Sequence, residues 1–231
     1  MKTQKIIEII IKAIIFDIDG SIMPQGGPIN PKVAEFMRFL IKLGIPMGPA
    51  TGKDEGYTRG LACGIGCVWD FIIAANGAQF LETISKDSPP AYRRHRLIDI
   101  GDHLDKFEKV INISINLGTF ISKDDILRHF RPESKDGVLS LFPSETDLEV
   151  TKEWVPFFEN IIKALGYKLR VIRYSDGCID IIPDQISKEL GIIKVCRLYE
   201  IERRNILVVV DGNNDFELTL GTKVLAVGNA V

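Results

Sequence analysis

Short runs of apolar residues alternate with helical patterns at both ends of this chain. The runs lie within residues 12–19, 44–51, 70–77 and 204–212. Strands that are apolar on both faces are typical of a parallel sheet covered by helices. We therefore predict an α/β fold whose core is a parallel, Rossmann-like sheet.

Two helical patterns accompany these runs. In the first, residues 31–43, apolar side chains recur at helical spacing, namely Val33, Phe36, Met37, Leu40 and Ile41. Asn30 suits an N-cap before Pro31, and Gly44 suits the end of the helix. The second pattern covers residues 186–199. Both helices are expected to cover the sheet.

The middle of the chain has a different pattern. Residues 110–118 and 168–183 suggest hairpin strands, and residues 153–166 suggest a helix. The turn sequence Ser-Asp-Gly divides the second of these segments, which favours antiparallel pairing. We therefore predict that an α+β cap, residues 83–183, is inserted into a core made of residues 1–82 and 184–231.

The composition changes this picture little. With 45% hydrophobic and 26% charged residues, the chain resembles soluble globular proteins. Its 29 basic residues nearly balance its 31 acidic ones, which argues against a nucleic-acid-binding protein. The basic cluster at residues 93–96 is interpreted as a solvated loop. The sequence carries no indication of how many copies associate.

The N-terminal segment and the cysteines bear on location. Its apolar stretch is interrupted by Glu8 and Lys12 and is shorter than the roughly 20 residues that a membrane-spanning helix needs. It also lacks the small-residue cleavage site of a signal peptide. The close pair Cys63 and Cys67 does not have zinc-site spacing, which favours reduced packing thiols over a metal or disulfide role. We expect a cytoplasmic protein without membrane association.

Two aspartates follow the first apolar run. In an extended chain, the side chains of Asp17 and Asp19 point to the same side, while Ile18 points to the other. Carboxylates beside a core are costly unless a cation or a shared proton compensates them. Gly20 then lets the chain turn sharply. The pattern predicts a metal site or acid–base chemistry.

Further polar clusters follow the other runs or open a helix beside them. They are Thr51 with Gly52, Lys188, and the segment 211–215, which contains the four acidic or amide side chains of Asp211, Asn213, Asn214 and Asp215. In open parallel α/β sheets, ligands bind at the carboxyl ends of the strands. Each cluster alone is a weak signal, but their positions predict one shared site.

In this order, the clusters resemble the motifs of the haloacid dehalogenase superfamily of phosphohydrolases. The matching segments are FDIDGS (16–21), PATGK (49–53), PDQISKELG (183–191) and VVDGNNDFE (209–217). AANGAQF (74–80) is similar to the turn before the cap in the Cof-type branch, where the cap lies between the second and third motifs. The resemblance implies a branch that includes sugar phosphatases and phosphoglycolate phosphatases, with substrate specificity in the cap.

The resemblance also implies catalytic roles. Asp17 would be the nucleophile that forms an aspartyl phosphate, and Asp19 the general acid and base. Thr51, Gly52 and Lys188 would bind the phosphoryl oxygens, and Lys188 would keep Asp17 ionised. Each position has a simpler alternative: a solvated turn for the two aspartates, a helix N-cap for Thr51, and a surface lysine for Lys188.

A metal site is implied by the same motifs. Mg²⁺ would be bound by Asp17, the backbone carbonyl of Asp19, Asp211 and Asp215, all of which offer oxygen ligands. Asn214 would orient the phosphate or the metal ligands. Asp215 is also compatible with an acidic residue that a helix N-terminus favours.

The chain departs from the family pattern at several positions. Ser21 replaces the commoner threonine, Lys53 the usual arginine, and Val210 a glycine, and the chain ends before a further helix that relatives usually have. Pro46 and Pro49 are unusual in a central strand because proline removes a hydrogen-bond donor. We therefore expect a short or distorted strand before Thr51. Asn76 is compatible both with a substrate contact and with a simple turn.

The sequence thus predicts a Mg²⁺-dependent phosphatase for a small phosphorylated metabolite, with phosphoglycolate and sugar phosphates as candidates. A phosphomutase of the same superfamily is an alternative, because it also needs the second aspartate. A catalytically silent binding or regulatory module is another. No nucleic-acid or membrane partner is expected.

Overall fold

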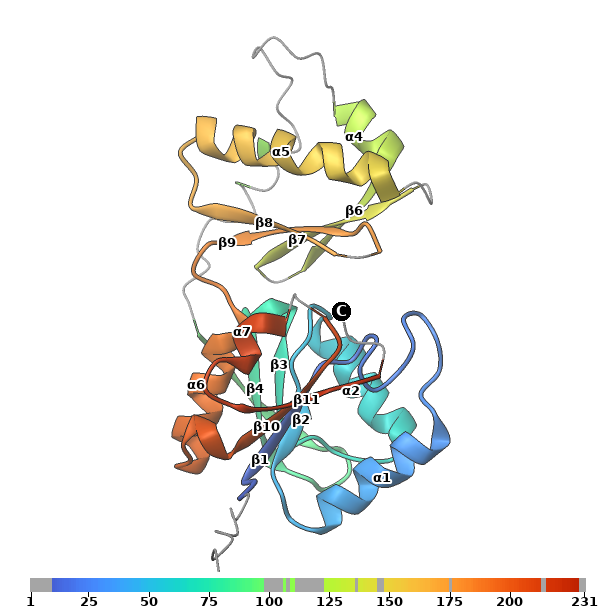
Figure 1. Cartoon of the computed structure of the whole chain (residues 1–231), viewed down its shortest axis with the longest axis vertical. Coiled ribbons are helices and arrows are strands. Elements are labelled where there is room, and N and C mark those ends of the chain that lie inside the picture. The colour runs from blue at the N-terminus through green and yellow to red at the C-terminus, as the bar shows by residue number, and fades with distance from the viewer. Residues whose placement is uncertain are drawn as a thin grey trace, which may run out of the picture. The chain divides into compact units, whose positions relative to one another are not determined.

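The computed structural model describes residues 10–97, 106, 109–110, 123–135, 137–144, 148–174, 176–212 and 215–228. The chain divides into two compact units (Figure 1). Residues 1–95 and 188–231 form one, here called the core unit, and residues 96–187 form the other, the inserted unit. The boundaries predicted from the sequence lie earlier, after residues 82 and 183. Strands β4 (Gln79–Ser85) and β5 (Ala91–Arg96) continue the sheet that begins with β3 (Phe71–Ala74) and so extend the core unit further along the chain.

The core unit consists of short strands and the helices between them. Its strands among the described residues are β1 (Ala13–Phe16), β2 (Met47–Pro49), β3 (Phe71–Ala74), β4 (Gln79–Ser85), β5 (Ala91–Arg96, whose last residue passes into the inserted unit), β10 (Ile206–Val210) and β11 (Lys223–Ala226). Its helices there are α1 (Pro31–Lys42), α2 (Glu55–Ile65), η1 (Ala75–Gly77), α6 (Lys188–Tyr199), η2 (Arg203–Asn205) and α7 (Phe216–Thr219).

The core of this unit is a parallel sheet with the strand order β11-β10-β1-β2. β1 pairs in parallel with both β10 and β2, and β10 pairs in parallel with β11. A second sheet has the order β3-β4-β5, and β3 and β4 are antiparallel. The predicted α/β fold with a parallel sheet is therefore confirmed. The carboxyl ends of β1, β2 and β10 lie at one edge, where ligands are expected.

The two sheets meet at β2, which is short, as its prolines predict. A single parallel bridge, Ala50 to Ile73, and a hydrogen bond from the Thr51 N–H to the Ile73 carbonyl (2.9 Å) join β2 to β3. In a parallel ladder, alternate residues point their N–H groups to the same neighbour. Pro49, two residues before Thr51, therefore has no donor to offer β3. The ladder is interrupted there, and the chain resumes pairing just before the candidate site.

Helix α1 confirms the predicted caps but corrects the predicted buried face. Asn30 accepts a hydrogen bond from the Lys32 N–H (2.9 Å). Ala34 and Met37 are buried against the sheet, whereas Phe36, which the apolar spacing places in the core, is 58% exposed. Apolar residues occupy more of this helix than one buried face can hold, so spacing alone could not identify the buried ones.

Helix α6 packs directly on β3. A methyl group at Gly191 would lie 2.5 Å from the Cδ1 atom of Ile73, so only glycine permits this approach. Ile192 and Val195 on the same helix are buried. Because Lys188 lies one turn before Gly191, this close packing fixes the start of α6, and with it Lys188, beside the carboxyl end of the sheet.

The inserted unit has its own core. An antiparallel sheet of order β6 (Phe130–Lys135), β7 (Val138–Pro143), β9 (Ile179–Pro183) and β8 (Leu169–Arg173) packs against α5 (Leu148–Ala164). Trp154 and Phe158 of α5 pack against Phe130 of β6, with ring centroids 5.5 and 6.3 Å apart. Its elements among the described residues are α4 (Lys123–His129), α5 (Leu148–Ala164), β6 (Phe130–Lys135), β7 (Val138–Pro143), β8 (Leu169–Arg173) and β9 (Ile179–Pro183).

Two of the three elements predicted for this unit fall on described residues. The antiparallel hairpin predicted at 168–183 is confirmed as β8 and β9, and the helix predicted at 153–166 is part of α5. The strand predicted at 110–118 lies outside the described residues except for Val110, which is helical. Within the described part of the chain, none of the helices has the length and apolar composition needed to cross a bilayer.

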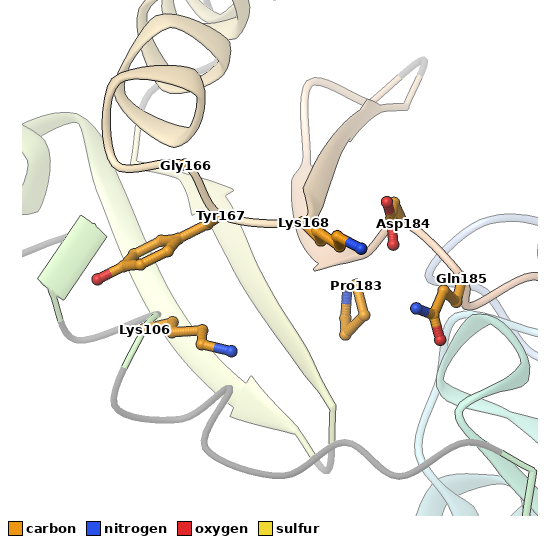
Figure 2. Close-up of a pocket in the computed structure, with 7 residues that line it drawn as sticks. All are labelled: Lys106, Gly166, Tyr167, Lys168, Pro183, Asp184 and Gln185. Carbon is orange, nitrogen blue, oxygen red and sulfur yellow. The ribbon is translucent and has the colours of Figure 1, made fainter.

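The inserted unit also contains a polar pocket of about 250 Å³. It lies between the turn after α5 and the end of β9, and Figure 2 shows the side chains around it. Its described lining residues are Lys106, Gly166, Tyr167, Lys168, Pro183, Asp184 and Gln185. None of these lining residues is a predicted catalytic residue. The candidate active site is therefore sought among the predicted catalytic side chains, which lie outside this pocket.

Candidate active site

Asp17 directly follows β1 and is buried at the edge of the parallel sheet. Its N–H donates to the Val209 carbonyl of β10 (2.9 Å), which continues the pairing of the two strands. Burial raises the pKa of Asp17 to about 6, against the opposing effect of the Lys188 ammonium. A carboxylate that is costly to ionise here requires nearby positive charge.

Asp211 lies beside this position, at the end of β10. The chain turns at Gly20 with φ +80°, and a methyl group there would lie 1.9 Å from Asp211 Oδ2. Both facts exclude other residue types at Gly20. The Ser21 hydroxyl donates to Asp211 Oδ1 (3.3 Å), a hydrogen bond for which the commoner threonine would also have the hydroxyl. Burial and the charge of Asp17 raise the pKa of Asp211.

Lys188 joins two of the aspartates. Its Nζ donates to Asp17 Oδ1 (2.9 Å) and to Asp215 Oδ1 (2.6 Å), and all three side chains are buried. Burial by itself lowers the pKa of Lys188, but the charges of Asp17 and Asp215 outweigh it and raise that pKa. A cation at a helix N-terminus opposes the helix dipole. The two carboxylate partners, Asp17 and Asp215, therefore stabilise the Lys188 ammonium at the start of α6.

The acidic cluster has the properties of a cation site. Asp17, Asp211 and Asp215 each offer one carboxylate oxygen, and these oxygens lie within 4.8 Å of one another. Asp215 Oδ2 is buried and makes no hydrogen bond within the described residues. Three carboxylates and one ammonium leave an excess of two negative charges if all are ionised. A divalent cation with oxygen ligands fits both the unpartnered oxygen and this excess charge.

Asp19 is not one of the three clustered carboxylates, although its charge acts on Asp17, and it has its own cationic partner. The chain leaves the strand after Phe16, and Asp19 forms an isolated bridge with Met23. Asp19 Oδ2 lies 3.1 Å from Lys53 Nζ, and the two side chains are 26% and 35% exposed. In the sequence, Lys53 stands out only as a departure from the family pattern. This pairing with Asp19 could not be inferred from its position after Thr-Gly.

The segment from Thr51 to Lys53 is held by the loop after β3. The Asn76 N–H donates to the Thr51 carbonyl (3.0 Å), and the Ala75 N–H donates to the Lys53 carbonyl (2.8 Å). Ala75 and Asn76 both have positive φ, of 48° and 55°. This strained turn places two successive donors against one loop. Asn76 is buried and therefore has at least this structural role.

Several alternatives from the sequence are resolved by this geometry. Thr51 is not the N-cap of α2, because Asp54 accepts the Tyr57 N–H (2.7 Å) in that role. The Thr51 hydroxyl instead accepts the Lys53 N–H (3.2 Å). Asp215 precedes α7 but makes no side-chain capping bond, since it pairs with Lys188.

Other residues singled out in the sequence have simpler outcomes. Lys188, not Lys194 on the same helix, contacts the aspartates. Cys63, Cys67 and the other two cysteines are free thiols. Asn214, predicted to orient the phosphate, lies outside the described residues. The structure thus brings together Asp17, Lys188, Asp211 and Asp215 within the core unit.

The chain is similar to several known proteins. The chain is 24% identical to a phosphoglycolate phosphatase of Methanopyrus kandleri over 208 residues, which are 89% of this chain and 78% of that protein. A solved structure from Thermoplasma acidophilum has a TM-score of 0.69 at 16% identity and covers 96% of this chain and 87% of its own.

The sucrose-phosphatase of Synechocystis, solved with sucrose and phosphate, has a TM-score of 0.62 at 17% identity, with 96% of this chain and 84% of that one covered. At these identities, the structural likenesses establish the fold. The family described as haloacid dehalogenase-like hydrolase matches residues 14–231, nearly the whole sequence. The resemblance read from the motifs is thereby confirmed, and the chain belongs to the haloacid dehalogenase-like hydrolase family.

Proposed function

We propose that this protein is a Mg²⁺-dependent phosphatase that hydrolyses a small phosphorylated metabolite through an aspartyl phosphate. The observation that carries the proposal is the convergence of Asp17, Asp211 and Asp215 around a common point, with Lys188 bound to two of them. An enzyme of the phosphoric monoester hydrolase class agrees with the family and with the phosphatases named among the relatives.

The proposed nucleophile is Asp17. A phosphate ester is itself an anion, so an attacking carboxylate needs its charge and that of the ester compensated. Bound Mg²⁺ would supply most of this compensation through Asp17, the Asp19 carbonyl, Asp211 and Asp215. Lys188 supports the same step, because its ammonium favours the ionised form of Asp17. Attack forms an acyl phosphate on Asp17 and releases the alcohol.

The remaining roles concern protons and phosphate oxygens. Asp19 would protonate the leaving oxygen and then take a proton from the water that hydrolyses the aspartyl phosphate. Thr51, Gly52 and Lys188 would bind the phosphoryl oxygens, and Asn214 would orient the phosphate. Thr51 is supported in this role because its loop is fixed by the donors of Ala75 and Asn76.

The inserted unit is proposed to be the cap that selects the substrate. It folds around its own hydrophobic core and interrupts the sequence of the core unit. Phosphoglycolate and sugar phosphates are the proposed substrates, since the relatives' names include a phosphoglycolate phosphatase and a sucrose-phosphatase.

A screen of phosphorylated metabolites with Mg²⁺ tests the proposed function. We expect release of inorganic phosphate from phosphoglycolate or from one or more sugar phosphates, and from p-nitrophenyl phosphate. Lys188→Met should be inactive, because Asp17 loses its ammonium, whereas Lys194→Met on the same helix is the matched control and should be active.

Other results of this screen would contradict the proposal. Transfer of phosphate between sugar hydroxyls that depends on an added bisphosphate would identify a phosphomutase. Binding of phosphorylated metabolites without phosphate release, at any pH between about 5 and 9, would identify a silent binding module.

The pairing of Lys53 with Asp19 leads to a second expectation. Both side chains are partly exposed, so the ion pair contributes roughly 0–1 kcal/mol to stability and its loss should not unfold the protein. Lys53→Met removes the charge that orients Asp19 but keeps the aliphatic stem. We expect kcat for an alkyl phosphate to fall about tenfold with little change in KM, because proton transfer from Asp19 is impaired.

The leaving group and a conservative variant provide the controls. p-Nitrophenyl phosphate needs little protonation of its leaving group, so its first step should be less affected by Lys53→Met. Lys53→Arg keeps a cation beside Asp19 and should retain most of the alkyl phosphatase activity. Equal losses in Lys53→Met and Lys53→Arg would show that Lys53 does not act by orienting Asp19.

A further inference from the structure

Helix α1 and its C-cap residue, Leu43, present three large apolar side chains to solvent. Phe36, Phe39 and Leu43 are 58%, 54% and 56% exposed, and the two phenyl rings are stacked with centroids 6.5 Å apart. They are spaced by three and four residues, so they form one stripe, here called the α1 stripe. α1 lies at the periphery of the core unit (Figure 1). Contiguous exposed apolar side chains of this size mark an interaction surface.

Charged residues border the α1 stripe on one side. Glu35 and Lys42 are exposed and form no ion pair within the described part of the chain. Arg38, on the same helix, is already engaged, since its guanidinium donates to the Ile65 carbonyl (2.7 Å). Beside the α1 stripe, the face therefore offers the acidic Glu35 before Phe39 and the basic Lys42 after it, while the exposed Lys32 lies about two turns before Phe39, beyond the end of the stripe.

These positions are complementary to themselves when the helix is reversed. Viewed along the helix axis, Glu35 and Lys42 lie about 40° and 60° from Phe39 on one side of it. Phe36 and Leu43 lie about 60° and 40° from Phe39 on the other side. Along the helix axis, Glu35 lies about 6 Å before Phe39 and Lys42 about 4.5 Å after it, while the corresponding distances for Phe36 and Leu43 are about 4.5 and 6 Å.

A two-fold axis through Phe39 pairs every one of these groups. It places Glu35 opposite the partner's Lys42 and Phe36 opposite the partner's Leu43, and it places Phe39 opposite its own copy. Self-complementarity of this kind is the requirement for an isologous interface, in which the same patch serves both subunits. A surface that binds a different protein has no such requirement.

We propose that the α1 stripe is the interface of a two-fold symmetric homodimer in which two copies of α1 pack antiparallel. The Glu35 and Lys42 pairs at its border set the antiparallel direction, because a parallel two-fold arrangement would place each of these charges opposite an apolar side chain of the partner. The interface lies on α1, whereas the proposed active-site residues lie on other elements of the core unit. Dimerisation therefore needs no change at the active site.

Sedimentation velocity of the full chain tests this proposal. At about 100 µM, the wild type should sediment as a dimer, and Phe39→Asp should sediment as a monomer, because each dimer would bury two unpaired carboxylates at its centre. Phe39 is exposed, so Phe39→Asp should keep the thermal midpoint of the monomer and its phosphatase activity. A monomeric wild type at this concentration, or a dimeric Phe39→Asp, would overturn the proposal.

Charge exchange tests the direction of packing. Glu35→Lys and Lys42→Glu should each raise the dimer dissociation constant about tenfold or more, since each places like charges opposite one another. The double variant Glu35→Lys/Lys42→Glu restores opposite charges and should restore the dimer. Glu159→Lys, an equal charge change at an exposed position of α5, is the matched control and should have no effect. Single variants that weaken the dimer without recovery in the double variant would exclude the antiparallel interface.

Discussion

Replacing Asp17 with asparagine should reduce kcat by a factor of about 10⁴ or more, because the attacking oxygen anion is lost while the rest of the site remains. Asparagine has nearly the same size as aspartate, and its carbonyl oxygen can still accept the hydrogen bond from Lys188. Steady-state release of p-nitrophenol and of inorganic phosphate, both with Mg²⁺ present, measures the loss.

The structure also predicts that Asp17→Asn remains folded. Burial raises the pKa of Asp17 to about 6, which means that ionising Asp17 costs more free energy in the metal-free folded protein than in the unfolded chain. Asparagine removes that buried charge, and Lys188 keeps Asp215 as its ionic partner. The thermal midpoint of the metal-free variant should therefore equal or exceed that of the wild type. A large fall would show that lost activity reflects unfolding.

Asp19→Asn should fail at a different step. Asp17 can still attack p-nitrophenyl phosphate, but no base then activates water for hydrolysis of the aspartyl phosphate. We expect a burst of nitrophenol, a covalent phosphate detectable by mass spectrometry, and turnover lower by about 10²–10⁴-fold. The exposed Asp87→Asn is the control and should be fully active. Near-normal activity in Asp17→Asn, or exchanged phenotypes, would refute these roles.

Much of the active-site arrangement follows from the order of the sequence motifs. A buried parallel strand delivers its carboxyl end to one edge of the sheet, and β1 and β10 are hydrogen-bonded neighbours. The aspartates that follow them, Asp17 and Asp211, therefore had to lie close together. The motif identifies Lys188 as a candidate, but its place beside the aspartates depends on the close packing of Gly191 against Ile73 of β3.

The sequence does not show which of several chemically similar residues is buried, caps a helix or forms an ion pair. In α1, more apolar residues are present than the sheet can cover, and only the packing shows that Met37 is buried while Phe36 is exposed. Asp54 and Thr51 are both suitable N-caps, and the hydrogen bond of Tyr57 decides for Asp54. The pairing of Lys53 with Asp19 depends on how two loops approach each other, which no local pattern encodes.

Removal of divalent cations should abolish phosphatase activity, and Mg²⁺ should restore it. The cluster of Asp17, Asp211 and Asp215 has excess negative charge, and one buried oxygen of Asp215 has no partner within the described residues. Mg²⁺ binds the folded cluster but has no equivalent site in the unfolded chain. At about 100 times its dissociation constant, it should therefore raise the thermal midpoint by about 5–10 °C.

The pH dependence of this stabilisation has a definite sign. The pKa of Asp17 is raised from 3.8 to about 6 in the folded protein, and burial also raises those of Asp211 and Asp215. Between about pH 4 and 6, the metal-free folded protein therefore binds more protons than the unfolded chain does. Its free energy of unfolding falls as the pH rises through this range. Because protons and Mg²⁺ compete for the same oxygens, the Mg²⁺ concentration for half-maximal stabilisation should increase as the pH is lowered from about 7 to 5.

Thermal melts and activity assays of ligand variants separate a bound cation from a general salt effect. Asp211→Asn should raise the Mg²⁺ concentration needed for half-maximal activity by about 10–100-fold or more and should reduce the Mg²⁺-dependent rise in thermal midpoint in parallel. Asp70→Asn, which lies before β3 and outside the cluster, should leave both quantities unchanged. Sodium chloride at equal ionic strength should not replace Mg²⁺, because it screens surface charges without binding to the carboxylates of the cluster. Phosphate release that survives exhaustive chelation, together with a thermal midpoint that does not respond to Mg²⁺, would mean that the acidic cluster holds protons and Lys188 alone.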